Sequence, residues 1–150
     1  MEPGRTYEEL SIGDRASAAK TISESDVYGF AGITGDFNPV HVNEEFARRT
    51  PFGTRIAHGG LSAGLAAPVL GMKLPGLGTV VTRMNVWFRA PVRFGDTITC
   101  AAEVVEKNDE KKRVKMKLTW TNQRGEEVMG GEASVIPPTA EMKKAFGGPG

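Results

Sequence analysis

A twelve-residue segment without a charged side chain, Gly60–Gly71 (GLSAGLAAPVLG), constrains the fold more than any other part of the chain. Its apolar residues would surround a helix rather than line one face, so a helix here must be buried on most sides. The small residues Ala63, Gly64 and Ala67 would let a sheet or a ligand approach the helix backbone closely. Because Pro68 removes one helical hydrogen bond, we expect a kink or an early end of the helix there.

Four segments in which apolar and polar residues alternate follow this helix, a pattern typical of half-buried strands. We expect strands over residues 80–89, 98–104, 114–120 and 128–136, with a frayed tail at 147–150. One buried helix followed by a long antiparallel meander predicts an α+β fold in which the sheet wraps the helix. Such a sheet keeps at least one open edge, which favours pairing with a second copy.

Shorter elements are expected before the buried helix. A weak alternating pattern over Arg15–Ile22 indicates an edge strand. Ser23 and Asp26 have the spacing of a capping box, which predicts a helix that begins at Glu24 and ends before Gly35.

A loop is expected between that helix and the next one. In the sequence DFNPVH, over residues 36–41, Pro39 biases Asn38 away from helical geometry, which predicts an extended and stiff loop. Asn43 can cap a second short helix directly after it. Stiffness matters for a site whose groups must be held closely.

Length, charge and cysteine content exclude several classes of protein. At 150 residues, we expect residues 1–150 to form a single domain with a real core. The formal charge of +1 gives no indication of a nucleic-acid partner. No apolar run approaches the roughly 20 residues of a membrane span, and the first residues lack the apolar core of a signal peptide. Cys100 is the single cysteine, which excludes an internal disulfide. We therefore expect a cytoplasmic domain without a membrane partner.

Asp36 and His41 place a carboxylate and an imidazole five residues apart, and a glycine pair follows before the apolar helix. Acid–base chemistry needs one group that takes a proton and another that gives one. A helix that begins at Gly59 and Gly60 offers free backbone N–H groups to a developing oxyanion. An isolated Asp and His would more often cap and pack a turn, but the combination is specific. We predict that Asp36 and His41 are catalytic.

His58 is the only other histidine, and we interpret it as structural, with a ring nitrogen bonded to a backbone carbonyl near the helix start. Two histidines near a carboxylate could also bind a metal. The two histidines do not have the i, i+4 spacing of a helical metal site, and no convincing third ligand is present. We therefore expect no metal and no other cofactor.

Several other residues are candidates for contact with substrate. Asn38 and Ser62 flank the predicted acid–base and oxyanion groups. Pocket depth should depend on side chains of the apolar helix, here Ser62, Leu65, Ala66 and Leu70. Three arginines lie on or beside one strand face, namely Arg83, Arg89 and Arg93. Most arginines are exposed to solvent, and a phosphate-binding role is considered only for Arg89 and Arg93.

The pattern D-x-N-P-x-H at residues 36–41, followed by A-H-G-x-L at 57–61, resembles the signature of the MaoC-like hydratases. It is most similar to the short, single-domain (R)-specific enoyl-CoA hydratases. The resemblance covers roughly Ser23–Val105, and Pro68 is less expected in it. It implies a hot-dog fold, in which a curved antiparallel sheet wraps one long helix, usually in a homodimer. It also implies a trans-2-enoyl-CoA substrate, with Asp36 and His41 holding the water.

The reaction that this resemblance implies is reversible syn addition of water, which gives an (R)-3-hydroxyacyl-CoA in fatty acid metabolism. The N–H of Gly59 or Gly60 would bind the thioester oxygen. Three alternatives stay open: a 3-hydroxyacyl-ACP dehydratase of fatty-acid synthesis, a hot-dog thioesterase and a non-catalytic acyl-CoA-binding protein. The intact Asp/His pair counts against the last, because ligand binding alone does not need both groups. The acyl chain length, and which of the two residues is the base, are left undetermined by the sequence.

Overall fold

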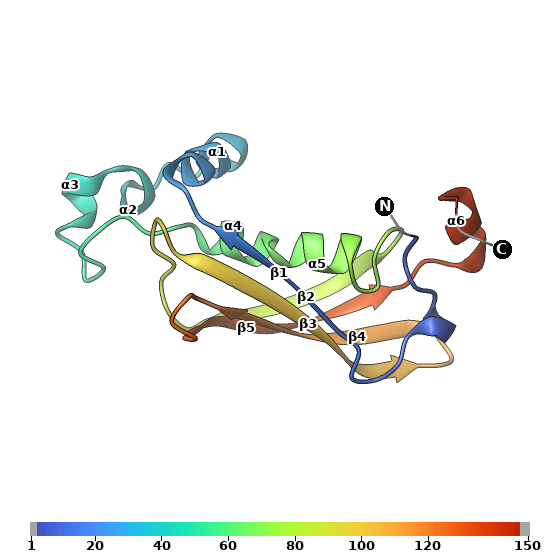
Figure 1. The fold of residues 1–150 in the computed structure, drawn as a ribbon. Helices are drawn as coiled ribbons and strands as arrows, with labels where there is room; N and C mark the ends of the chain where they lie inside the picture. Colours follow the sequence, from blue (N-terminus) through green and yellow to red (C-terminus); the bar gives the residue numbers. More distant parts are fainter. Residues whose placement is uncertain (1–2, 148–150) are drawn as a thin grey trace.

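A curved five-stranded antiparallel sheet covers two consecutive helices in the computed structural model, which describes residues 3–147 (Figure 1). The strands are β1 (Arg15–Thr21), β2 (Val80–Phe88), β3 (Thr97–Asn108), β4 (Arg113–Thr121) and β5 (Glu127–Ile136). All four predicted strands and the predicted edge strand are present. This arrangement is the hot-dog fold, so the α+β prediction is confirmed. The predicted tail lies outside the described residues except for Gly147, whose N–H donates to the carbonyl of Lys144.

The strand order β1-β3-β4-β5-β2 differs from the meander that the sequence predicts. Hairpins do join β3 to β4 and β4 to β5. β2, however, crosses to the far edge and pairs with β5, because β1 already occupies the free edge of β3. The sheet therefore has β1 at one edge and β2 at the other.

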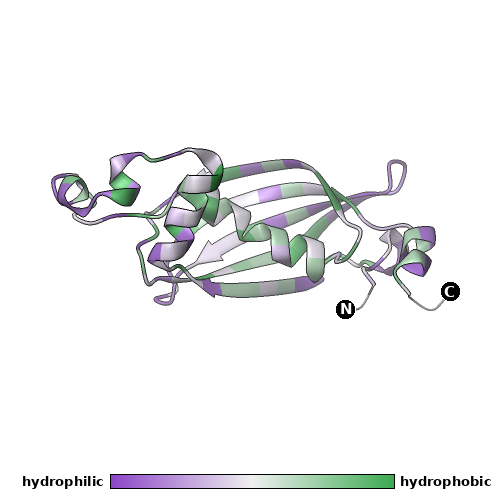
Figure 2. Ribbon diagram, turned by 90° about the horizontal axis from the view of Figure 1, so that it is seen from above, coloured by the Kyte–Doolittle hydropathy of each residue, from purple (hydrophilic) through white to green (hydrophobic). Residues whose placement is uncertain are grey.

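The apolar segment forms two helices, α4 (Gly59–Gly64) and α5 (Ala66–Met72), which together cross one face of the sheet (Figure 2). The break lies at Leu65, three residues before the expected kink. A proline ring collides with the carbonyl of the residue four positions earlier, here Gly64, so the helix must end before Pro68. Pro68 itself lies in the first turn of α5, where its missing N–H would have no helical acceptor.

The core lies between α5 and the inner face of the sheet. Ala66, Val69 and Leu70 are buried on the helix side. Alternate residues of β3 and β4 are buried opposite them, as expected for strands with one face in the core. The largest of the fully buried side chains is that of Trp120 on β4.

Three short helices lie beyond one end of the sheet: α1 (Glu24–Thr34), α2 (Pro39–Val42) and α3 (Glu44–Ala47) (Figure 1). The predicted capping box of α1 is confirmed, since Oγ of Ser23 accepts from the N–H of Asp26 and the Asp26 carboxylate accepts from the N–H of Ser23. Gly35 ends the helix with φ of 78°. Asn43 caps α3, also as predicted.

The expected extended loop over residues 36–41 is wrong in its second half. Pro39 begins α2, because a proline at the first helical position loses no helical hydrogen bond and already has a helical φ. Oδ1 of Asn38 accepts from the N–H of Val40 and caps this turn. His41 therefore lies on a helical turn and not on a loop.

Two further elements lie at the opposite end of the sheet and were not predicted. They are the 3-10 helix η1 (Tyr7–Glu9) and α6 (Ala140–Ala145), capped by Thr139. No helix within residues 3–147 combines the length and the apolar character that membrane crossing requires.

Candidate active site

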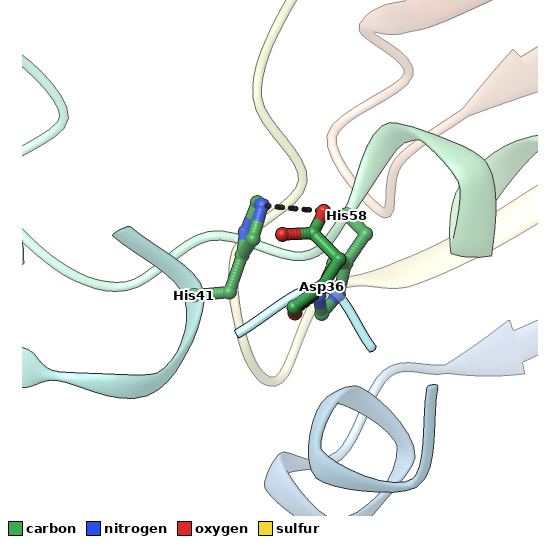
Figure 3. A group of neighbouring side chains, drawn as sticks. All are labelled: Asp36, His41 and His58. Atoms are coloured by element: carbon green, nitrogen blue, oxygen red, sulfur yellow. Dashed lines mark hydrogen bonds and ion pairs between the residues drawn. The ribbon is translucent and has the colours of Figure 1, made fainter. Parts of the chain in front are cut away.

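Asp36, His41 and His58 converge at the N-terminal end of α4 (Figure 3). Oδ2 of Asp36 lies 3.9 Å from Nε2 of His41. The Asp36 side chain is half exposed, whereas His41 is buried. The structure thus brings together the carboxylate and the imidazole that the sequence pairs, with the carboxylate open to solvent.

The imidazole of His41 is oriented by a backbone carbonyl. Its Nδ1 lies 2.8 Å from the carbonyl oxygen of Ile56. Because a carbonyl oxygen only accepts, Nδ1 carries the proton, and the lone pair of the neutral ring is on Nε2. Nε2 is also the atom that faces Asp36. With the neutral ring, the pair therefore presents a carboxylate oxygen and a nitrogen lone pair side by side.

His58 contacts both members of this pair. Its Nε2 lies 2.9 Å from the backbone carbonyl oxygen of Asp36, and its ring stacks on that of His41 with centroids 3.9 Å apart. The structural interpretation of His58 predicted a bond to a carbonyl near its own helix start. The acceptor is instead in the segment after α1, so His58 connects the two halves of the site.

The expectation that no third metal ligand is near the two histidines is wrong. Candidate ligand atoms of Asp36, His41 and His58 lie within 4.8 Å of one another. The two rings are nearly parallel, at 29°, so their nitrogen lone pairs run side by side rather than toward one point. Nε2 of His58 is engaged with a carbonyl, which leaves its buried, unpartnered Nδ1 as the only ring atom of His58 that could bind a metal. This geometry fits acid–base chemistry better than metal coordination.

An apolar cavity of about 340 Å³ opens beside the pair. His41, Gly59 and Ser62 line it together with apolar side chains, among them Phe52, Ile56, Phe88, Val92 and Met129. These apolar residues come from β2, β5 and two connecting segments, and the sequence analysis missed them. The cavity can hold an acyl chain with its reactive end at His41.

The predicted substrate contacts divide into two groups. Gly59 and Ser62 line the cavity, and the buried Ser62 hydroxyl has no hydrogen-bond partner in the protein. Asn38 caps α2, and Gly60 packs against Phe30, so neither lines the cavity. The predicted depth residues are also partly wrong, because three of the four do not line the cavity, namely Leu65, Ala66 and Leu70.

Gly59 begins α4 at the cavity wall. N–H groups in the first turn of a helix have no acceptor within it, and the side chain of His58 does not cap this end. A Cβ on Gly59 would lie 2.7 Å from Cε1 of Phe88, closer than van der Waals contact allows. Glycine at position 59 therefore allows Phe88 to pack over this backbone. The uncapped N–H groups of the first helical turn remain free to donate beside the cavity.

Arg55 connects α1 and α3 beside the site, a role that no local sequence pattern indicates. Its guanidinium binds the carboxylates of Glu24 on α1 and Glu44 on α3 and the hydroxyl of Tyr28. Arg55 directly precedes Ile56, the residue whose carbonyl orients the imidazole of His41. The charge cluster thus fixes the segment on which that orientation depends.

Both carboxylates in this cluster have a lowered pKa. The guanidinium of Arg55 lowers the pKa of Glu24, and the backbone N–H of Arg55 lowers the pKa of Glu44. A carboxyl group with a lowered pKa stabilises the folded state above its ordinary pKa, and the contribution is lost as the pH falls toward the lowered value. The cluster is therefore intact at neutral pH.

Two of the arginines noted in the sequence lie near the cavity. Arg93 donates to the carbonyl oxygen of Phe52 at 2.7 Å, so it is engaged in structure. Arg89 lines the cavity and pairs with Glu127 at 2.8 Å. Of the two arginines considered for phosphate binding, only Arg89 is at the cavity.

Replacing His58 with Ala should lower kcat while leaving KM within about twofold, because His58 positions the backbone of Asp36 and does not line the cavity. Misplacement by about 1 Å can cost 10²-fold in rate, and we expect a loss of about 10- to 100-fold. His58→Gln keeps an N–H donor and should recover part of it. Steady-state kinetics of both variants test this. Unchanged kcat in His58→Ala would contradict a positioning role.

Comparison with known proteins gives consistent similarities over most of the chain. Residues 11–124 match the family model described as MaoC like domain. An (R)-specific enoyl-CoA hydratase of Rhodospirillum rubrum is 50% identical over 132 residues, which are 88% of this chain and 91% of the relative. A 3-hydroxybutyryl-CoA dehydratase of Methylorubrum extorquens is 49% identical over 136 residues, 90% of this chain and 85% of the relative.

Solved structures agree with the sequence comparisons. An R-hydratase from Pseudomonas aeruginosa in the unliganded form superposes with a TM-score of 0.86 at 38% identity, covering 91% of this chain and 88% of that one. The matched residues 11–124 include both Asp36 and Gly59. The similarity therefore extends through the candidate site as well as the sheet.

Proposed function

The chain belongs to the MaoC-like domain family, and from that premise we propose that it is a hydro-lyase that reversibly hydrates trans-2-enoyl-CoA to (R)-3-hydroxyacyl-CoA. The observation that carries the proposal is the 3.9 Å separation of Asp36 Oδ2 and His41 Nε2 beside an apolar cavity. Relatives that are 50% and 49% identical have names that specify this reaction or its reverse.

One water molecule fits between the two catalytic groups. A water oxygen about 2.8 Å from each atom can donate one hydrogen to Asp36 and the other to the lone pair on His41 Nε2. As the water oxygen attacks C3, one of its protons passes to the pair. A proton from the pair is then delivered to C2, so the pair returns to its starting state. Because both groups lie on one side of the substrate, hydroxyl and proton add to the same face.

The charge that develops on the thioester oxygen needs hydrogen-bond donors at the cavity. The N–H of Gly59 lies at the start of α4, where no helical acceptor competes for it. Ser62 lines the same cavity, and its buried hydroxyl, which has no protein partner, can serve as a second donor. Removing one such donor costs about 10²- to 10³-fold in other enzymes.

A homodimer through β2 is part of the proposal. β2 is an edge strand, and eight of its nine residues are exposed. Large apolar side chains account for much of that surface: Val80, Val81, Met84, Trp87 and Phe88. An exposed apolar edge pairs readily with a second copy, and a twofold axis would join the two edges antiparallel. The single-domain assignment and the cytoplasmic location stay predictions.

The proposed reaction is tested with purified protein and crotonyl-CoA. We expect loss of the enoyl absorbance, formation of 3-hydroxybutyryl-CoA and no release of free thiol. The same acyl group on an acyl carrier protein should react more slowly, because the named relatives quoted above act on CoA thioesters. Thiol release without hydration would indicate a thioesterase. A higher rate on the carrier protein would indicate the acyl-carrier-protein dehydratase instead.

A further inference from the structure

Asp36 and His41 are carried by different helical elements, and their relative position depends on how those elements are joined. Asp36 comes two residues after Thr34, the last residue of α1, whereas His41 lies on α2. α3 follows α2 directly, since Asn43 ends one helix and caps the next. All three helices lie beyond the end of the sheet (Figure 1). The separation of the catalytic pair therefore depends on what connects α1 to α2 and α3.

The guanidinium group of Arg55 is such a connection. Its Nη1 donates to the carboxylate of Glu24 and to the hydroxyl of Tyr28, both on α1. Its Nε donates to Oε2 of Glu44 on α3 at 3.2 Å. Among the residues that the structure describes, no other side chain has hydrogen bonds or ion pairs to both helices. Because the guanidinium group is planar and rigid, it fixes the two carboxylates relative to each other.

Glu44 accepts further hydrogen bonds from the segment that contains Arg55. The hydroxyl of Thr54 donates to Oε1 of Glu44 at 3.0 Å, and the backbone N–H of Arg55 donates to Oε2 at 3.2 Å. The next residue along, Ile56, donates its N–H to the carbonyl oxygen of Val40 on α2 at 3.2 Å. This segment is therefore bonded to both α2 and α3, and the Arg55 side chain extends the same connection to α1.

Arg55 is also shielded from solvent, unlike the other arginine that pairs with Glu44. Its side chain is 19% exposed, and its guanidinium carbon lies 4.7 Å from the ring centroid of Phe94, in the connection between β2 and β3. Charge-assisted hydrogen bonds are stronger where water is excluded. Arg48 lies 3.5 Å from the same carboxylate, but its side chain is 62% exposed and it pairs only with residues of α3. Arg55, and not Arg48, therefore couples the two helices.

We propose that Arg55 is a positioning residue for the hydration, which sets the approach of Asp36 to His41 by binding α1 and α3 with one guanidinium group. This inference rests on the proposed function. Arg55 does not line the catalytic cavity, so it acts through the pair and not on the substrate. Both catalytic groups must reach one water molecule, and a displacement of about 1 Å can cost 10²-fold in rate. Loss of Arg55 should therefore slow the chemical step and leave substrate binding intact.

Arg55→Met tests this role, because Met keeps an unbranched apolar side chain beside Phe94 and loses the hydrogen bonds to both helices. In steady-state kinetics with crotonyl-CoA, we expect kcat to fall about 10- to 100-fold and KM to stay within about twofold. Arg55→Lys keeps the charge but not the planar group, so it should recover part of the loss. The matched control is Arg48→Met, which removes an exposed arginine from the same carboxylate and should leave kcat unchanged.

The same substitution in the Asp36→Asn background separates positioning from other roles. If Arg55 acts through the catalytic pair, Arg55→Met should slow Asp36→Asn by no more than about twofold, because residues that act as a unit have non-additive effects. A further 10- to 100-fold loss in that background would overturn the assignment. An unchanged kcat in Arg55→Met, or a loss confined to KM, would overturn it as well. Circular dichroism at the assay temperature gives the folded fraction of each variant, and kcat is expressed per folded protein.

Crystal structures of the wild type and of Arg55→Met give a readout that does not depend on activity. The variant should show Oδ2 of Asp36 and Nε2 of His41 farther apart than the 3.9 Å of the intact site. The same separation in both proteins would contradict the proposal. Failure of the proposed function is distinguishable, because the wild-type protein would then hydrate no enoyl thioester, whereas the structures would still show whether Arg55 sets the separation of the pair.

Discussion

Asp36→Asn and His41→Gln are each expected to lower kcat for crotonyl-CoA hydration by about 10³-fold, within the range of about 10²- to 10⁴-fold for general acid–base groups. The amide of Asn cannot take a proton from the water, and the amide of Gln has no basic nitrogen at the position of Nε2. Both groups contact the same water in the proposed mechanism. Rates of loss of the enoyl absorbance measure the effect.

The double variant Asp36→Asn/His41→Gln should be little slower than either single variant, because residues that act as a unit have non-additive effects. Asp36 is half exposed, so its substitution should leave the thermal unfolding temperature nearly unchanged. Circular dichroism of each variant controls for the fold. Near wild-type hydration by either single variant would contradict the assignment of the pair.

Trp120→Ala is expected to lower the free energy of unfolding by about 3–5 kcal/mol, the usual cost of truncating a buried aromatic residue. Trp120 is fully buried on β4, between Cys100 on β3 and Met129 on β5. Its loss leaves a cavity in the core beneath α4 and α5. Urea unfolding followed by circular dichroism measures the change.

Trp120→Phe is the matched control for this prediction. The indole N–H of Trp120 is buried without a hydrogen-bond partner, so its removal loses no bond. Phe retains most of the apolar area, and we expect a loss smaller than half that of Ala. Equal destabilisation by the two substitutions would contradict a cost set by the buried apolar volume of the ring.

Local signals account for the parts of the fold that the sequence predicts correctly. The capping box of Ser23 and Asp26 acts within one turn, and the alternation in residues 98–136 reflects the burial of one sheet face. The position of β2 beside β5 depends on contacts between residues far apart in the sequence, and no local pattern encodes it. The six residues of α6 are too few for a helical period to be recognised.

The residues of the candidate site also fall into those that the sequence predicts and those that it does not. Asp36, His41 and Gly59 belong to short motifs whose chemistry is legible in the sequence, and the structure brings them together. Arg55 and Phe88 reach the site from a connecting segment and from an edge strand. Their roles depend on tertiary packing, which the residue types alone do not specify.

The geometric reason for the proposed stereochemistry is the shared position of the two catalytic groups. Oδ2 of Asp36 and Nε2 of His41 face each other across 3.9 Å, and His41 lines the cavity. A substrate that approaches them presents a single face of its double bond. Oxygen and proton must therefore both arrive from that face.

Hydration of crotonyl-CoA in deuterated water, followed by proton NMR and chiral analysis of the product, tests this claim most directly. The proposed mechanism predicts the 3R alcohol with one deuteron at C2, added to the same face as the hydroxyl group. Anti addition or deuterium on both faces of C2 would contradict delivery of water and proton by one Asp36–His41 pair, and a 3S alcohol would contradict the proposed (R)-specific product.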